Sequence, residues 1–250
     1  MTGADLAGRT AIITGAASGI GASIANAFGR EGAQLLLADR DAGRLAATVK
    51  GLAGTAEVRL KAIDVTDETQ VGAMVADCLD AFGRADVLVN CAGMVQEVPF
   101  LEMTTADWDT MIEVDLRSVF LCSRAVAPRM VGQGWGRIIN LASQLGIKGG
   151  TNVAHYVAAK AAVIGLTKAL ARELAPAGVL VNAIAPGPIE TPLIRNLSDK
   201  WRRAKEAELP LGRFGLPSEV APTAVLLASD PGGNLFVGQV LGPNSGDVMP

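Results

Sequence analysis

The stretch TAIITGAASGIG, residues 10–21, decides the fold of this 250-residue chain. Its first five residues are apolar or β-branched, which predicts a buried strand, and an amphipathic pattern predicts a helix over 19–31. Between them lies a glycine-rich turn, where the backbone can approach an anion and the first helical N–H groups face it. The stretch therefore predicts a binding site for the pyrophosphate of a dinucleotide, although glycines are also common in ordinary strand-to-helix turns.

The alternation of strand and helix continues along the chain. Strands are predicted at 10–14, 34–39, 58–63, 86–90, 137–142, 179–184 and 239–241, and helices near 19–31, 41–52, 67–82, 105–132, 154–176 and 217–229. Repeated βα units are typical of a parallel sheet with helices on both faces. We therefore expect an α/β fold with a doubly wound, seven-stranded parallel sheet.

Glycine, proline or polar residues lie at or just after the ends of the predicted strands. They are Gly15, Asp39, Asp64, Asn90, Ser143 and Pro186. The carboxyl ends of parallel strands meet at one edge of a sheet, and ligands bind beyond that edge. These residues should therefore gather in one site.

Tyr156 and Lys160 lie four residues apart at the start of a predicted helix, and Ser143 lies thirteen residues upstream. Residues at i and i+4 share a helix face, so the ammonium can stand beside the phenol. A free phenol has a pKa of ~10 and is a poor base at neutral pH. A nearby cation lowers that pKa, and a tyrosine placed in this way can take a proton from an alcohol or give one to a ketone. A tyrosine and lysine at this spacing, taken alone, can equally be two surface residues.

Composition excludes several classes of partner. The formal net charge is 22 − 25 = −3 and the chain has no block of Lys and Arg, which argues against nucleic acid or an anionic membrane. Residues 1–6 lack the features of a signal peptide, and no apolar run approaches the ~20 residues of a membrane-spanning helix. Cys78, Cys91 and Cys122 do not have the spacing of metal ligands. An odd number of cysteines suggests reduced thiols, so we expect a cytoplasmic protein without a metal.

Taken together, the motifs resemble the short-chain dehydrogenase/reductase family over almost the whole chain. Residues 14–21 resemble its TGxxxGxG cofactor loop, and 90–93 resemble its NNAG segment with Cys91 in place of the second Asn. Residues 186–191 resemble its PGxIxT turn, and 213–217 and 238–241 match its C-terminal segments. The resemblance implies one dinucleotide-binding and catalytic domain over residues 1–250.

The resemblance also assigns roles. Tyr156 is the expected acid/base, Ser143 holds the substrate oxygen, and Lys160 anchors the nicotinamide ribose. The family often has a fourth catalytic residue, an Asn, and this chain has Asp115 at that place. A carboxylate near Lys160 would partly cancel the effect of the lysine on Tyr156. The implied cofactor contacts are Gly15, Ser18, Gly19, Ile20, Gly21, Asp39, Arg40, Asp64, Val65, Asn90, Ala92, Gly93, Tyr156, Lys160, Pro186, Gly187, Ile189 and Thr191, and the implied substrate contacts are Ser143, Gln144, Leu145, Tyr156 and Pro188.

Two positions predict NAD as the cofactor. Asp39 ends the second strand, where a carboxylate can bind the ribose hydroxyls and repels a 2′-phosphate. Ser18 stands where NADP-dependent relatives usually carry a basic residue. Arg40 favours NADP instead, because its guanidinium could contact the 2′-phosphate. The neighbouring Asp39 would repel that phosphate.

We expect an NAD-dependent oxidoreductase that transfers a hydride between the cofactor and a secondary alcohol or ketone, a small hydroxy compound. The alternative is a 3-oxoacyl-[acyl-carrier-protein] reductase, which the chain resembles overall. Such reductases usually prefer NADPH and carry arginines that dock the acidic carrier protein, at places where this chain has Gly134-Trp135 and Ala175-Pro176-Ala177. A third hypothesis is a catalytically silent NAD-binding regulatory protein.

The remaining expectations concern the pocket and the assembly. The stretch 190–215 is polar and irregular, and we interpret it as a mobile lid over the substrate pocket rather than a surface helix without a role. Further candidate pocket residues are Met94, Gln96, Glu97, Asn152, Ile194 and Trp201. By the resemblance we expect a homotetramer paired through apolar faces of the helices near 105–132 and 154–176, formed by Val119, Phe120, Val126, Val163, Leu166 and Leu170.

Overall fold

A computed structural model describes residues 5–52, 57–194 and 199–249 of the chain. Its strands form one seven-stranded sheet in the order β3-β2-β1-β4-β5-β6-β7, with every neighbouring pair parallel. The strands are β1 (Thr10–Thr14), β2 (Gln34–Asp39), β3 (Val58–Ala62), β4 (Val87–Asn90), β5 (Gly136–Leu141), β6 (Val179–Ile184) and β7 (Val240–Leu241). The order reverses between β1 and β4, which makes the carboxyl ends of these two strands the expected ligand crevice. The predicted fold class is confirmed.

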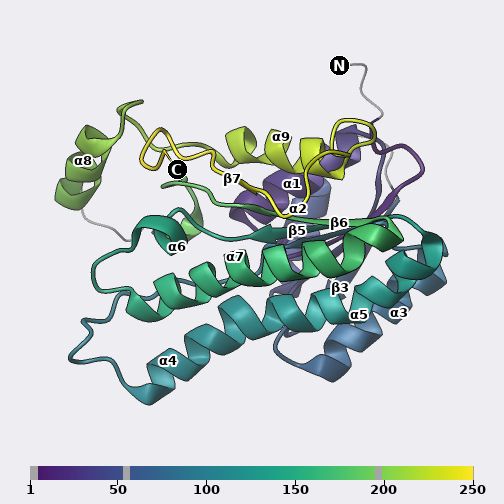
Figure 1. Cartoon of the computed structure of the whole chain (residues 1–250), viewed down its shortest axis with the longest axis horizontal. Helices are drawn as coiled ribbons and strands as arrows, with labels where there is room; N and C mark the ends of the chain where they lie inside the picture. The colour runs from purple at the N-terminus through teal and green to yellow at the C-terminus, as the bar shows by residue number, and fades with distance from the viewer. Residues whose placement is uncertain (1–4, 53–56, 195–198, 250) are drawn as a thin grey trace.

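Helices cover both faces of the sheet, as Figure 1 shows. One layer contains α1 (Gly19–Arg30), α2 (Ala42–Lys50) and α9 (Pro217–Ala228), and the other contains α3 (Glu68–Phe82), α4 (Thr105–Ile112), α5 (Ser118–Gln133) and α7 (Ala154–Leu174). Alternate residues of β1 and β2 belong to the two cores: Ile13 and Leu37 face the layer of α1, whereas Ile12 and Leu36 face that of α3. The central strands are therefore apolar on both faces, which explains their continuous hydrophobic sequences.

The predicted helix over 105–132 is interrupted. A π-helical turn, η1 (Glu113–Arg117), separates α4 from α5, and Asp115 in that turn is fully buried. The burial of Met111, Asp115 and Ser118 keeps the spacing of an ordinary helix, so the sequence pattern did not indicate the change. Single π turns inside α-helices are found frequently at functional sites.

The stretch 190–215 is not irregular throughout, which corrects the sequence prediction. It contains the short 3₁₀ helix η3 (Pro192–Ile194) and the helix α8 (Asp199–Glu208). The sequence of α8, DKWRRAKEAE, is almost entirely polar and lacks the apolar stripe by which a helix is identified. Two shorter helices were also missed, α6 (Leu145–Lys148) and the 3₁₀ helix η2 (Ala175–Ala177).

The helix faces expected to pair between subunits are partly used inside the chain. Val119, Val126 and Val163 are buried in its own cores, with exposed fractions of 2%, 0% and 0%. Phe120 on α5 is exposed, and Leu166 and Leu170 on α7 are half-buried. The sequence argument for pairing was therefore wrong for the three valines, because helical periodicity cannot distinguish a core face from a subunit interface.

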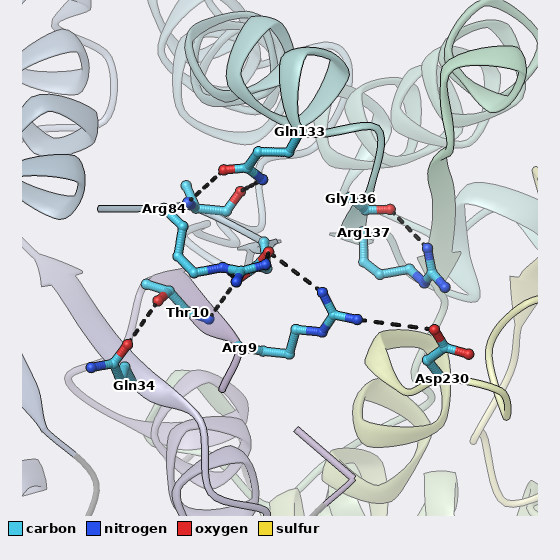
Figure 2. A network of polar contacts seen from close by, with 10 residues as sticks. Arg9, Thr10, Gln34, Arg84, Gln133, Gly136, Arg137 and Asp230 are labelled. Atoms are coloured by element: carbon cyan, nitrogen blue, oxygen red, sulfur yellow. Dashed lines mark hydrogen bonds and ion pairs between the residues drawn. The ribbon is translucent and has the colours of Figure 1, made fainter. Parts of the chain in front are cut away.

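A polar network closes the amino edge of the sheet, opposite the predicted site (Figure 2). The buried carboxylate of Asp86 accepts hydrogen bonds from Arg84 Nε and Nη2, both at 2.6 Å, and from the backbone N–H of Thr10 at 2.9 Å. Arg9 lies 3.8 Å from Asp86, and its guanidinium lies 3.7 Å from the centre of the Trp135 ring. These contacts join the amino ends of β1, β4 and β5.

Two sequence expectations concern membranes and metals. No helix in the described part of the chain is long and apolar enough to cross a membrane. Among residues 5–52, 57–194 and 199–249, no group of three His, Cys, Asp or Glu side chains is placed to hold a metal ion.

Candidate active site

The four predicted catalytic residues come together at the carboxyl edge of the sheet. Ser143 follows β5, Tyr156 and Lys160 lie in the first turns of α7, and Asp115 comes from η1. The ammonium nitrogen of Lys160 lies 2.9 Å from Asp115 Oδ1 and 5.6 Å from the centre of the Tyr156 ring. It also donates a hydrogen bond to the carbonyl oxygen of Leu141, at 3.0 Å, a contact that the sequence did not predict.

Asp115 and Lys160 form a buried ion pair, with side chains 0% and 6% exposed. The other carboxylate oxygen, Asp115 Oδ2, accepts a hydrogen bond from the backbone N–H of Met94 at 3.0 Å. A Cβ atom at Gly93 would lie 2.8 Å from Asp115 Oδ1 and 3.5 Å from the Lys160 ammonium. Gly93 is therefore required for the chain after β4 to lie over this pair.

The environment sets the protonation of the tyrosine and the lysine. Burial raises the pKa of Tyr156 and the charge of Asp115 raises it further, while Lys160 and a hydrogen bond with Ser143 lower it, and the net shift is upward. Lys160 lowers the phenol pKa and Asp115 opposes it, as the sequence predicts, but burial is the largest contribution and makes the net shift upward. Burial lowers the pKa of Lys160, but Asp115 and Tyr156 raise it, and the net upward shift keeps the ammonium charged at neutral pH.

The Ser143 hydroxyl is held in place from its own loop. Its oxygen accepts a hydrogen bond from the backbone N–H of Leu145 at 3.1 Å, and its interaction with Tyr156 lowers the pKa of the phenol. The backbone N–H of Gln144 donates to the carbonyl of Pro186 at 3.1 Å, which joins the serine loop to the turn after β6. The predicted substrate contact Gln144 and the predicted cofactor contact Pro186 are therefore neighbours.

A chain of buried amide and hydroxyl side chains lies beneath the site. Asn90 Nδ2 donates to Asn140 Oδ1 at 2.8 Å and to Ser123 Oγ at 3.1 Å, and Asn140 Nδ2 donates to Thr167 Oγ1 at 2.9 Å. Asn90 is a predicted site residue, whereas Asn140 and Thr167 are not among the residues predicted from the sequence. An Asn inside the apolar strand β5 was the available signal, since buried amides need partners.

The glycine loop before α1 has the shape of a cofactor cradle. Gly15 has a left-handed φ of 66°, and a Cβ atom there would lie 2.7 Å from the backbone nitrogen of Ala92. A Cβ atom at Gly21 would lie 2.3 Å from the carbonyl oxygen of Gly15. Thr14 Oγ1 accepts hydrogen bonds from the N–H groups of Cys91 and Ala92, at 3.1 and 3.2 Å. Backbone packed this closely, at the N-terminus of a helix, fits a dinucleotide pyrophosphate.

The predicted adenosine-side residues lie at the ends of β2 and β3. Asp39 Oδ2 accepts from the backbone N–H of Ala17 in the glycine loop at 3.1 Å, and Oδ1 accepts from the N–H of Asp41 at 3.1 Å. Asp64 is exposed, and hydrogen bonds from Thr66 lower its pKa. The carboxylate at the end of β2 is therefore fixed beside the cradle.

The remaining predicted cofactor and substrate contacts differ in their burial, and so do the further pocket candidates. Ser18, Gly19, Ile20, Leu145, Gly187, Pro188 and Thr191 are half-buried around the site, Val65 and Ile189 are buried, and Arg40 is exposed. Of the further pocket candidates, Met94, Gln96 and Ile194 are half-buried, whereas Glu97 and Asn152 are exposed. The side chain of Trp201 lies outside the described part of the structure.

Comparison with known proteins agrees with this geometry. The model of a family described as Enoyl-(Acyl carrier protein) reductase matches residues 15–246. A 3-oxoacyl-[acyl-carrier-protein] reductase of Thermotoga maritima is 41% identical over 247 residues, covering 98% of this chain and 99% of the relative. A (2S)-[(R)-hydroxy(phenyl)methyl]succinyl-CoA dehydrogenase subunit of Thauera aromatica is 42% identical over 234 residues, covering 93% and 94%.

A solved structure leads to the same family. A short-chain type dehydrogenase/reductase from Mycobacterium marinum superposes with a TM-score of 0.92 at 35% identity, and the match covers 98% of both chains. The ordered motifs, the sheet order and these relatives agree over nearly the full length. The protein is an oxidoreductase that uses a nicotinamide cofactor, and the chain belongs to the short-chain dehydrogenase/reductase family.

Proposed function

We propose that the protein is an NAD(H)-dependent oxidoreductase that interconverts a secondary alcohol and the corresponding ketone, with Tyr156 as the acid/base. The observation that carries this proposal is the cluster at the carboxyl edge, where Ser143 and Lys160 lie beside Tyr156 and the ammonium is 5.6 Å from the centre of the phenol ring. The bound nicotinamide would supply or accept the hydride, and the protein supplies orientation and electrostatics.

Each catalytic side chain has a defined task in this proposal. Ser143 holds the substrate oxygen by its hydroxyl, and Tyr156 gives a proton to that oxygen during reduction or accepts one during oxidation. Lys160 has three N–H donors, of which one faces Asp115 and one bonds to the Leu141 carbonyl. The third remains for the ribose of the cofactor.

The protonation of Tyr156 predicts how each reaction direction depends on pH. The protonated phenol is the form that donates a proton during reduction of a ketone. Oxidation needs the phenolate, so its rate should increase as the pH rises. A comparison of both directions over a range of pH tests this part of the proposal.

Asp39 supports NAD over NADP. Its carboxylate at the end of β2 is held against the glycine loop by the Ala17 N–H, where a 2′-phosphate would meet a negative charge. Arg40 is exposed and adjacent, and it is the residue that could favour NADP instead. Measurement of kcat/KM with both cofactors decides the question, and a preference for NADP(H) would refute this part.

The second candidate is reduction of a 3-oxoacyl thioester, which the names of the relatives favour: one acts on an acyl-carrier-protein substrate and another on a CoA thioester. Gly134-Trp135 and Ala175-Pro176-Ala177 stand where carrier-protein docking arginines are expected from the family resemblance, which argues against a carrier protein. A panel of small ketones, 3-oxoacyl-CoA and 3-oxoacyl-carrier protein separates the candidates. No turnover of any substrate with either cofactor would support the silent NAD-binding alternative.

The assembly and the location remain proposals. Exposed Phe120 and half-buried Leu166 and Leu170 support pairing of α5 and α7 in a homotetramer. Sedimentation at micromolar concentration tests the tetramer, and a monomer would contradict it. The free cysteines, of which Cys78 and Cys122 are buried, are consistent with the proposed cytoplasmic location.

A further inference from the structure

The two ends of the segment that carries α8 lie side by side. At its base, Ile189 pairs with Gly215, the N–H of Glu190 donates to the Gly215 carbonyl at 2.8 Å, and the N–H of Gly215 donates to the Pro188 carbonyl at 3.0 Å. Helix α8 is therefore carried by an excursion with a closed base. Arg202 of α8 pairs with Glu190 at this base and lies 4.9 Å from the centre of the Phe214 ring, and α8 makes further contacts away from the base.

The Asp247 carboxylate contacts several segments at once, α8 among them. Asp247, near the C-terminus, is 6% exposed at its side chain and accepts from three segments. Lys205 of α8 lies 2.9 Å from Oδ2, Lys148 of α6 lies 2.6 Å from Oδ1, and Gln144 Nε2 donates to Oδ2 at 2.5 Å. Gln144 directly follows Ser143, so a single residue joins α8 to the catalytic serine loop.

The backbone that presents Asp247 is itself a tight turn. Ser245 and Gly246 have left-handed φ values of 57° and 86°, and the N–H of Asp247 donates to the Asn244 carbonyl at 3.1 Å. The N–H of Leu211 donates to the Ser245 carbonyl at 3.2 Å, which ties the turn to the end of the excursion. The turn is also attached to the segment after β6, where the N–H of Gly187 donates to the Pro243 carbonyl at 3.1 Å.

The charges are arranged so that the contact persists at neutral pH. Burial raises the pKa of Asp247, but hydrogen bonds from Lys148 and Lys205 lower it, and the net shift is downward. The pKa of Lys205 is shifted upward, since its bonds to Asp247 and Glu208 outweigh burial. The Asp247 carboxylate and the Lys205 ammonium are therefore charged together.

We propose that Asp247 is a positioning residue that holds α8 closed over the substrate side of the Ser143 loop. The proposal rests on the hydride-transfer function proposed above for Ser143, Tyr156 and Lys160. With the carboxylate present, α8 and Gln144 are fixed relative to the serine that holds the substrate oxygen. Without it, two ammonium groups lose their shared acceptor, and α8 loses its connection to the serine loop.

Asp247→Asn is the direct test, because it keeps the size of the side chain and removes the charge. We expect KM for the ketone to rise about tenfold, in line with the loss of hydrogen bonds to a charged group, while kcat changes much less. The dissociation constant of NADH, measured by fluorescence without substrate, should stay unchanged. Hydrogen exchange of the peptide covering 199–208 should become faster, and Asp247→Glu should restore part of both effects.

Glu208→Gln is the matched control. Glu208 also lies 3.0 Å from Lys205, but this pair lies within α8 and its carboxylate is 64% exposed, so it joins no two segments. The control should leave KM and the exchange of α8 unchanged. Equal effects of Asp247→Asn and Glu208→Gln would overturn the proposal.

The remaining outcomes are also decisive. Unchanged KM and unchanged exchange in Asp247→Asn would show that the carboxylate holds nothing, and faster exchange with unchanged KM would show that α8 has no role in substrate binding. If Asp247→Asn does not fold, Lys205→Met removes the α8 partner and must reproduce the rise in KM. A wild-type protein without any turnover would refute the proposed function instead, while the exchange experiment would still report on the contact itself.

Discussion

Two carboxylates lie fully buried at opposite edges of the sheet, and they differ in how completely they are satisfied. Asp86 at the amino edge accepts two hydrogen bonds from Arg84 and one from the Thr10 N–H, with Arg9 nearby. Asp115 at the carboxyl edge faces one ammonium and accepts from one backbone N–H. Within the described residues, its Oδ1 has no partner with hydrogen-bond geometry.

The partners differ as well. The side chains of Arg84 and Arg9 are 41% and 25% exposed, so water solvates part of their charge, whereas Lys160 is 6% exposed. The Asp86 network also contains no group that must change its protonation in a reaction. The Asp115 pair lies beside Tyr156, whose proton the proposed reaction moves. The comparison teaches that a complete buried network holds strands together, while an incomplete one beside a titratable group indicates chemistry.

The largest effect is expected at the carboxyl edge. Tyr156→Phe removes the phenol that transfers the proton, so kcat should fall by roughly 10²–10⁴-fold. NADH binding by fluorescence and the thermal midpoint should remain close to wild type, because the ring is kept. Near-wild-type turnover would show that another group is the acid/base.

The next effect is expected at the amino edge and concerns stability. Asp86→Ala leaves the Thr10 N–H and the Arg84 guanidinium without their acceptor and removes one of the two carboxylates near Arg9, which should cost about 3 kcal/mol of unfolding free energy in a urea titration. This is the lower end for a buried pair, since both arginines reach water. KM and kcat of the folded fraction should not change. Asp86→Asn, which keeps an acceptor for the Thr10 N–H, should lose less.

A smaller loss of stability is expected for the ring in the same network. Trp135 lies 3.7 Å from the Arg9 guanidinium and 4.3 Å from that of Arg137, measured to the ring centre. Trp135→Leu should lower the unfolding free energy by about 1–2 kcal/mol, the sum of two cation–π contacts. Phe120→Leu is the control, because the Arg124 guanidinium lies 5.7 Å from that ring on the surface. Equal losses in the two variants would argue against the cation–π contribution.

The subtlest effect is expected for Asp115→Asn, which should displace a pH profile rather than abolish activity. The Asp115 charge raises the pKa of Tyr156, and oxidation requires the phenolate, so the oxidation rate of the wild type rises with pH through that raised pKa. Removing the charge should move this rise to lower pH. Superimposable profiles would eliminate the electrostatic role, and a collapse of activity would show that the carboxylate itself is required.

The sequence was sufficient for the fold because the signals were local. Alternating βα units, the glycine loop after β1 and the strand-end polar residues all follow from short-range patterns, and the family resemblance extended them along the chain. The elements it missed lack such a pattern. Helix α8 has no apolar stripe, and the π turn η1 keeps the helical spacing of its buried residues. The prediction of subunit faces was wrong at Val119, Val126 and Val163. Helical periodicity shows that a residue is buried, but it does not show whether the chain's own core or another subunit buries it.

The sequence by itself determined which chemical groups the site contains: a serine, a tyrosine, a lysine and an aspartate in place of an asparagine. Only the tertiary structure decided how their charges combine, since the pKa of Tyr156 depends on its burial and on the charges of Lys160 and Asp115 nearby. It also decided that Asp247 meets Gln144, Lys148 and Lys205, which lie between 42 and 103 residues away along the chain. Electrostatic interaction depends on separation in space and on exclusion of water, and neither can be read from the order of residues.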